Sequence, residues 1–187
     1  MSWTMNNLCW CLVMAGLCWP SLGTPAEILE NSVRRHEQEF IIHVELAVDA
    51  SVTDVRAIVS QLNKLSRLSK SVIASEVSSV PSTETIRLRV VLRPCVLWFC
   101  RTIVKVSAVK RIQRDRWEFE GLPELSDFRS ARESLTVGFR DGRSVLRYDA
   151  ALVPGFFVPR IIGVWAVRHV IARELRHVAH EIERLSH

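Results

Sequence analysis

Residues 40–48 alternate between apolar and polar side chains, a pattern typical of a strand with one buried face. Directly after this strand, Ser51 and Asp54 have the spacing of a helix-capping pair. Apolar residues then recur at helical intervals as far as Leu62, and a second short helix is predicted over 64–69. This region is therefore expected to form one strand followed by two short helices.

A run of further strands follows, separated by turns. The segment 81–83 has the composition of a turn, and Asp141-Gly142 is a strong hairpin signal. In one of the strands Val104, Val106 and Ala108 share a face. The predicted strands span 72–80, 86–93, 102–110, 116–120, 128–139 and 144–152.

The chain ends in a long amphipathic helix. Seven apolar residues fall on one helical stripe: Ile161, Val164, Ile171, Leu175, Val178, Ile182 and Leu185. A run of antiparallel strands needs one face covered, and this is the only predicted element long enough to cover it. We therefore predict an α+β fold in which a curved antiparallel sheet wraps around the C-terminal helix.

This order of elements resembles the START-like superfamily, also called SRPBCC, in its polyketide cyclase/dehydrase and coenzyme-Q-binding branch. Four segments carry the resemblance: 48–68, 95–101, 126–129 and 153–159. One departure is Val52, where the family usually has Pro at the first helical turn. The resemblance implies the helix-grip fold and an internal cavity for lipids, quinones or polyketides, but it does not imply one reaction.

Residues 1–23 carry no charged side chain, and their apolar run over 8–19 is too short to span a bilayer as a helix. Small residues end the segment at Ser21 and Gly23. We predict a signal peptide over 1–23, a polar leader over 24–38, and a ligand-binding domain over 39–187. The expected location is the bacterial periplasm. Because no Lys or Arg precedes the apolar run, an N-terminal membrane anchor or a wrongly chosen start codon remains an alternative.

The net charge of +5 falls wholly after residue 23. The basic residues are spread over strands and the last helix, which argues against nucleic-acid binding and is compatible with weak attraction to anionic lipid. No spacing of Cys and His predicts a metal site, and no motif predicts a cofactor or a catalytic centre. The expected partner is a hydrophobic small molecule or lipid.

The apolar rows on the strands should face the stripe of the last helix and either line a cavity or fill a core. Tyr148 is the single tyrosine and needs a polar partner there. Arg168 falls near the middle of the apolar stripe, where it either lines a wet cavity or reaches outward to the rim. The candidate ligand-binding residues are Leu65, Leu68, Ile86, Leu88, Val90, Leu146, Tyr148, Ala150, Trp165 and Arg168.

Cys95 and Cys100 are the two cysteines left after residue 23. They can form a disulfide if the chain turns between them, with a hairpin tip over 96–99; otherwise they are two thiols in one long buried strand. Apolar loop residues would then contact a membrane or gate the cavity. These are Val96, Leu97, Trp98, Phe99, Phe156 and Phe157.

Two functions from different classes are compatible with these features. The first is an exported binding or carrier protein that holds a hydrophobic ligand. The second is an enzyme of the cyclase or dehydrase kind, in which a polar group moves a proton within the same cavity. The inward faces are expected to offer few acid–base residues, so the sequence favours the carrier.

Overall fold

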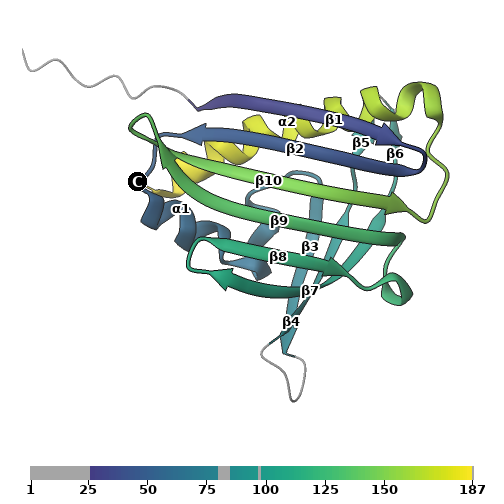
Figure 1. Cartoon of the computed structure of the whole chain (residues 1–187), viewed down its shortest axis with the longest axis horizontal. Coiled ribbons are helices and arrows are strands. Elements are labelled where there is room, and N and C mark those ends of the chain that lie inside the picture. The colour runs from purple at the N-terminus through teal and green to yellow at the C-terminus, as the bar shows by residue number, and fades with distance from the viewer. Residues whose placement is uncertain (1–25, 80–84, 97, 187) are drawn as a thin grey trace, which may run out of the picture.

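The protein is described here by a computed structural model that places residues 26–79, 85–96 and 98–186. The predicted signal peptide over 1–23 lies outside the described residues. Eight strands form one antiparallel sheet in the order β1-β2-β10-β9-β8-β7-β4-β3. The sheet curves around the long helix α2, and two further strands, β5 and β6, form a separate small hairpin (Figure 1).

The strands are β1 (Glu27–His36), β2 (Glu39–Val48), β3 (Val72–Ser79), β4 (Ile86–Leu92), β5 (Cys95–Val96), β6 (Phe99–Cys100), β7 (Ile103–Gln113), β8 (Arg116–Gly121), β9 (Phe128–Arg140) and β10 (Arg143–Pro154). The helices are α1 (Val52–Val59), the 3₁₀ helices η1 (Leu62–Arg67) and η2 (Pro123–Leu125), and α2 (Arg160–Ser186).

The predicted α+β helix-grip architecture is confirmed. Helix α1 begins as the capping pair requires, because the Ser51 hydroxyl oxygen accepts a hydrogen bond from the Asp54 amide at 3.1 Å. The second short helix is the 3₁₀ helix η1. The turn at Asp141 and Gly142 joins β9 to β10, and both residues have positive φ angles of 53° and 80°, which glycine adopts without strain.

The structure differs from the sequence interpretation before residue 39. Much of the expected polar leader over 24–38 is the edge strand β1, which pairs along its length with β2. An edge strand buries few side chains, and here Val33 is the fully buried one, so its apolar alternation is weak. Its stability comes mainly from backbone hydrogen bonds to β2, which side-chain pattern does not reveal.

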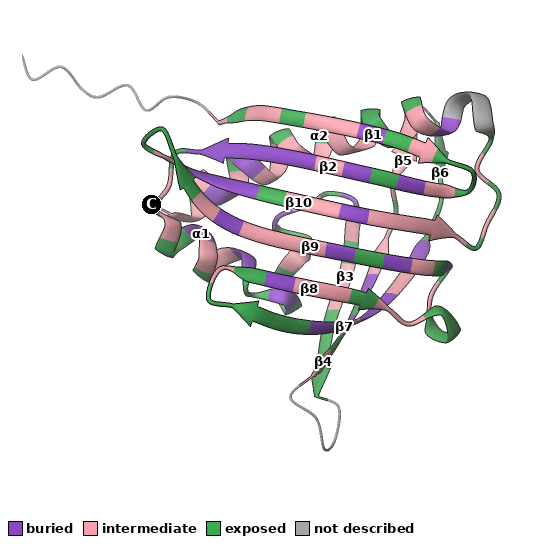
Figure 2. Ribbon diagram, in the orientation of Figure 1, coloured by how far each residue is buried: buried purple, intermediate pink, exposed green. Residues whose placement is uncertain are grey.

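The buried apolar residues form three clusters rather than one continuous core. The first cluster lies beneath α1, η1 and the C-terminal half of α2, and includes Leu46, Val55 and Ile182. The second packs β1, β2 and β10 against the N-terminal half of α2. The third, smaller cluster is formed by Ile103, Phe128 and Ala131. Figure 2 shows buried positions concentrated on β2 and the strands beside it.

Ion pairs around Glu45 link three strands on the outer face of the sheet. This buried carboxylate accepts hydrogen bonds from Arg147 Nε at 2.8 Å and from Arg140 at 2.9 Å. The bond from Arg147 holds the pKa of the Glu45 carboxyl below its ordinary value; burial opposes this effect and Arg140 adds to it. The three strands β2, β9 and β10 are thereby linked through one side chain.

Acidification should remove the contribution of Glu45 to stability. Because its folded-state pKa is lowered, the stabilisation is fully present above the unfolded pKa of about 4.3 and is lost as pH falls through the lower folded value. Both arginines are about half exposed, so we expect Glu45→Gln to lower the free energy of unfolding by about 1 kcal/mol at pH 7. Urea unfolding at pH 7, 5 and 3 should show this difference shrink; a constant difference would contradict the assignment.

Candidate functional site

A charged group lies on the inner face of the sheet, beneath α2. The ammonium of Lys105 on β7 contacts both carboxylate oxygens of Glu133 on β9, at 2.8 and 2.6 Å. The Tyr148 hydroxyl on β10 donates to the same carboxylate at 2.5 Å. The three residues are named here the inner triad. The expectation that the inward faces have few acid–base residues is therefore wrong.

Strand register explains why these three side chains meet. Glu133 is paired with Ala150 on β10 and with Phe119 on β8, and partners directly opposite each other point to the same face. Lys105 is paired with Val90, whose side chain is buried in the first cluster. The long lysine side chain can therefore cross the width of β8 to reach Glu133.

The inner triad is shielded from solvent but is not sealed. The side chain of Glu133 is 3% exposed and that of Lys105 is 15% exposed. Burial raises the pKa of Tyr148 well above its ordinary value, and the negative charge of Glu133 adds to this, so the hydroxyl stays protonated and donates. A buried charge needs such partners, because moving a charged group from water into the protein interior costs several kcal/mol of free energy.

Ser107 adds an unused polar group to this face. It lies two residues beyond Lys105 on β7, opposite the buried Leu88, and is itself 1% exposed. Within the described part of the chain, its hydroxyl oxygen has no hydrogen-bond partner. A buried hydroxyl without a partner is costly, and because protein atoms cover it, a polar group of a ligand reaches it only when neighbouring side chains move aside.

Several inward apolar side chains near the inner triad are only partly buried. They would be shielded almost completely if the interior were packed at the usual density of a protein core. They include one residue each from strands β4, β8 and β9 and two from α2: Leu92, Phe119, Leu135, Ile171 and Leu175. Part of the apolar surface on this side of the sheet and on α2 is therefore accessible to solvent.

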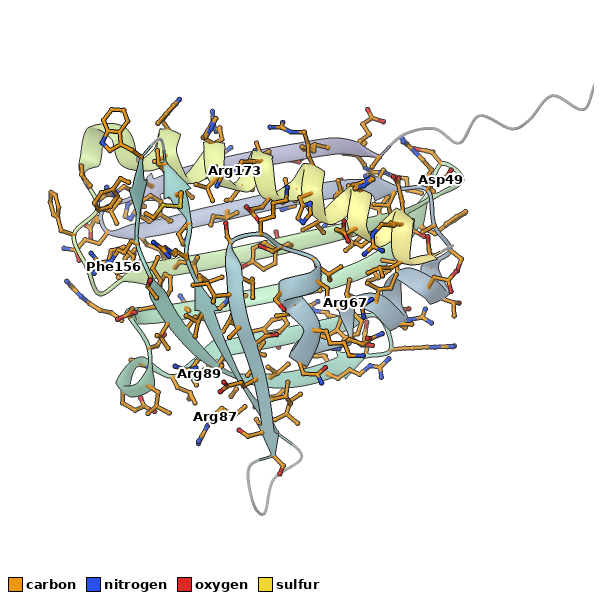
Figure 3. All side chains as sticks on the ribbon, turned by 180° about the vertical axis from the view of Figure 1, so that it is seen from behind. Asp49, Arg67, Arg87, Arg89, Phe156 and Arg173 are labelled. Carbon is orange, nitrogen blue, oxygen red and sulfur yellow. A yellow bond between two sulfur atoms is a disulfide. The ribbon has the colours of Figure 1, made fainter. Side chains whose placement is uncertain are left out.

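A small pocket of about 110 Å³ opens where α1, η1 and the C-terminal end of α2 meet. Sites for drug-sized ligands are larger, about 300–1,000 Å³, so this pocket holds only a small part of a lipid or quinone. Figure 3 shows Arg67 on η1 at this end of the molecule. The lining residues are Ile58, Gln61, Lys64, Arg67, Leu68 and Leu185.

Helix α2 is held across the interior by different contacts on its two sides. Apolar side chains attach it to β1 and β2. On the opposite side Glu174 accepts hydrogen bonds from the hydroxyls of Ser69 at 2.6 Å and Ser71 at 2.8 Å. Burial raises the pKa of Glu174, but these bonds outweigh it and the net pKa lies below the ordinary value. The second side is therefore closed by polar contacts, which water can replace more readily than apolar packing.

The predicted ligand-binding residues fall into three groups. Most of the strand and 3₁₀-helix residues are buried or packed in the first cluster: Leu65, Leu68, Ile86, Leu88, Val90 and Leu146. Ala150 is buried in the second cluster, and Tyr148 belongs to the inner triad. Trp165 and Arg168 are placed elsewhere, on the exposed surface of α2.

Trp165 does not line the interior, contrary to the prediction, and Arg168 follows the second of its two alternatives, which places it at the rim. Trp165 is 54% exposed and stacks on His169 at 5.4 Å between ring centroids. Arg168 donates to the backbone carbonyl of Val33 on β1 at 3.4 Å, so it reaches outward to the rim of the sheet. Strand β1, which the sequence did not predict, packs its Val33 in the second cluster with Val164, Val167 and Ile171 of α2, so these residues and not Trp165 or Arg168 form the covered side of the helix.

The structure joins Cys95 and Cys100 by a disulfide across the hairpin of β5 and β6. The alternative of one long strand with two thiols does not describe this structure. Val96 is partly buried, Trp98 and Phe99 are exposed, and Leu97 lies outside the described residues. In the second loop, Phe157 is exposed, whereas Phe156 packs edge-on against Phe128 at 6.1 Å.

Lys105, Glu133 and Ser107 were not selected from the sequence. Glu133 carries a signal that could have found it, because it interrupts an apolar alternation of Ala131, Leu135 and Val137 on β9. Lys105 and Ser107 alternate with Val104, Val106 and Ala108, so they lie on the other face of β7. The inward face of β7 is the one that carries Lys105 and Ser107.

The fold is shared with known lipid-transfer and cyclase structures. A STAR-related lipid transfer protein from Xanthomonas axonopodis superposes with a TM-score of 0.61 at 15% identity, covering 85% of this chain and 99% of that one. The Zhui aromatase/cyclase from Streptomyces sp. R1128 gives 0.56 at 13% identity, with 78% and 94% covered. The two-domain aromatase/cyclase BexL of the BE-7585A biosynthetic pathway gives 0.58 at 14% identity, with 81% and 51% covered.

No family model and no curated protein matches the sequence. This chain spans about half the length of BexL. The structural similarity shows that the protein has the START-like helix-grip fold, as the sequence resemblance implied. Within the described residues, no helix is long and apolar enough to cross a membrane, and no three metal-ligating side chains gather into a site.

Proposed function

We propose that this protein binds an apolar small molecule or lipid in the interior between the curved sheet and α2, and acts as its carrier. One observation carries the proposal. The inward apolar side chains of Phe119 and Leu135 on the sheet and of Leu175 on α2 stay partly exposed. A ligand in this space would cover apolar surface that the chain alone leaves accessible.

The polar groups on the same face indicate what kind of ligand fits. Ligand sites combine a mostly apolar lining with a few polar groups that fix orientation. Here the polar groups on the same face as the apolar lining are those of the inner triad and the unpartnered hydroxyl of Ser107. The ligand is therefore an apolar molecule with at least one hydroxyl or carbonyl group, such as a sterol-like alcohol, a quinone or a polyketide.

The proposal includes export to the bacterial periplasm. The uncharged apolar residues 1–23 support it, and the bond between Cys95 and Cys100 is of a kind that persists in oxidising compartments.

A second candidate is a cyclase or dehydrase acting in the same space. The inner triad favours this reading, since it places an ammonium and a phenol within hydrogen-bond distance of one carboxylate. A ligand released chemically unchanged indicates a carrier, whereas one released with altered mass indicates catalysis.

Two fluorescent probes with the same long alkyl chain test the proposal, one ending in a hydroxyl and the other in a methyl group. Both should bind one to one, with the hydroxyl probe tighter by about 2- to 10-fold, because one net hydrogen bond is worth about 0.5–1.5 kcal/mol. Ser107→Ala should abolish this preference. The matched control Ser134→Ala alters a hydroxyl on the outer face of β9. Probe fluorescence that never saturates would contradict the proposal.

A further inference from the structure

Three aromatic side chains project into solvent at one end of the molecule. The exposed fractions of Trp98, Phe99 and Phe157 are 89%, 68% and 85%. They come from two segments more than 50 residues apart, the β5–β6 hairpin and the loop before α2. We name these three residues the aromatic tip. Solvent-exposed aromatic rings concentrated at one place need an explanation, whereas a single exposed ring does not.

Contacts beneath the aromatic tip hold its two segments together. The guanidinium of Arg101, next to Cys100, lies over the ring of Phe156 at 4.2 Å from its centre. Arg173 on α2 donates to the carbonyl of Cys95 at 3.2 Å. Figure 3 shows Phe156 near one end of the molecule and Arg173 further inward, near the middle of α2.

The disulfide fixes the shape of the hairpin that carries Trp98 and Phe99. Strands β5 and β6 have two residues each and are not part of the main sheet. An isolated two-stranded hairpin of this length has little stability of its own in water. The covalent bond between Cys95 and Cys100 closes the base of the hairpin and keeps Trp98 and Phe99 at its far end.

Positive charge surrounds these rings. Arg93 and Arg101 flank the hairpin and are exposed, and neither makes an ion pair with a described carboxylate. No acidic residue lies between them in the sequence. Arg173 supplies a third guanidinium, whose nearest ion-pair partner is Glu174 at 3.8 Å. The tip therefore combines protruding rings with Arg93 and Arg101, which have no ion pair to a described carboxylate, and with Arg173, which has one long one.

We propose that the aromatic tip docks the protein onto a bilayer surface that contains anionic phospholipid. Aromatic rings of this kind insert at the boundary between headgroups and acyl chains, while arginines beside them meet lipid phosphates. A stable protein partner would need about 800 Å² of complementary surface on this side, which three rings on a narrow hairpin and a loop do not provide. A fluid bilayer needs no such complementarity.

The first test is partition of the full chain into vesicles of phosphatidylglycerol and phosphatidylethanolamine, compared with phosphatidylcholine alone. The variant Trp98→Ser with Phe99→Ser should bind the anionic vesicles roughly tenfold to a hundredfold more weakly than the wild type. Phe139→Ser is the matched control, because Phe139 is also 68% exposed but lies at the β9–β10 turn. Control binding should equal that of the wild type.

The second test locates the contact, so that binding through residues 1–23 cannot be mistaken for docking by the tip. Photoactivatable phospholipid in the same vesicles should cross-link to peptides containing 94–101 and 155–159. The variant Cys95→Ser with Cys100→Ser should lose most of these cross-links. Cross-links confined to other segments would overturn the proposal. Equal partition of the wild type and the Trp98→Ser, Phe99→Ser variant would also overturn the proposal. If that variant partitions normally and changes only the rate of probe uptake, the tip gates the interior and does not dock the protein.

Discussion

Replacing Lys105 with Met is expected to lower the free energy of unfolding by about 3–5 kcal/mol, the usual cost of leaving one member of a buried ion pair alone. The carboxylate of Glu133 is 3% exposed and would keep only the hydroxyl of Tyr148 as a donor. For a chain of this size the melting temperature should fall by roughly 10 °C. Thermal unfolding at pH 7 measures the change.

Two further variants separate this effect from a general loss of packing. The double variant Lys105→Met with Glu133→Gln removes both charges but leaves an amide oxygen that can accept from Tyr148, so it should recover most of the lost stability. Lys110→Met changes an exposed lysine further along β7 and should alter stability by less than about 0.5 kcal/mol. Equal destabilisation by the single and double variants would contradict the buried pair.

Enlarging Leu135 to Trp should block ligand binding while leaving the fold intact. Leu135 faces the interior from β9, opposite Tyr148 and Trp117, and is partly exposed. A larger ring there can occupy the space proposed for the ligand, whereas the same change at the tightly packed Ala150 would strain the second cluster. We expect affinity for the hydroxyl probe to fall at least about tenfold, with a loss of stability below about 1 kcal/mol.

The matched control is Thr136→Trp, which adds the same ring one residue away on the outer face of β9. It should bind the probe as the wild type does. If Leu135→Trp instead destabilises the protein by about 1–3 kcal/mol and binds the probe normally, Leu135 is part of a filled core and the ligand space lies elsewhere.

The order of elements could be predicted from sequence because each element carries its own local pattern. Every second residue from Phe40 to Val48 is apolar, Ser51 and Asp54 mark a helix start, and α2 has an apolar stripe. The spacing of the two cysteines likewise allowed a hairpin between Cys95 and Cys100, but the backbone path was needed to decide between this hairpin and one long strand.

The interior could not be predicted to the same extent, because it depends on contacts between distant strands. Lys105 and Glu133 meet across β8, 28 residues apart in sequence, and neither local pattern shows that the other is near. The positions of Trp165 and Arg168 could not be decided from the stripe of α2 alone, because Arg168 bonds to the backbone of β1, an edge strand with little apolar pattern. A charged residue inside an apolar alternation, as at Glu133, is the signal that such a site leaves in a sequence.

The central claim is that the interior of this START-like fold holds an apolar ligand. Native mass spectrometry tests it most directly, after the protein has been incubated with a total lipid extract of its host and reisolated by gel filtration. The account predicts one added mass per folded chain, matching a lipophilic molecule with a hydroxyl or carbonyl group, and absent from Leu135→Trp. Wild-type protein that shows only its unliganded mass after this treatment would contradict the account.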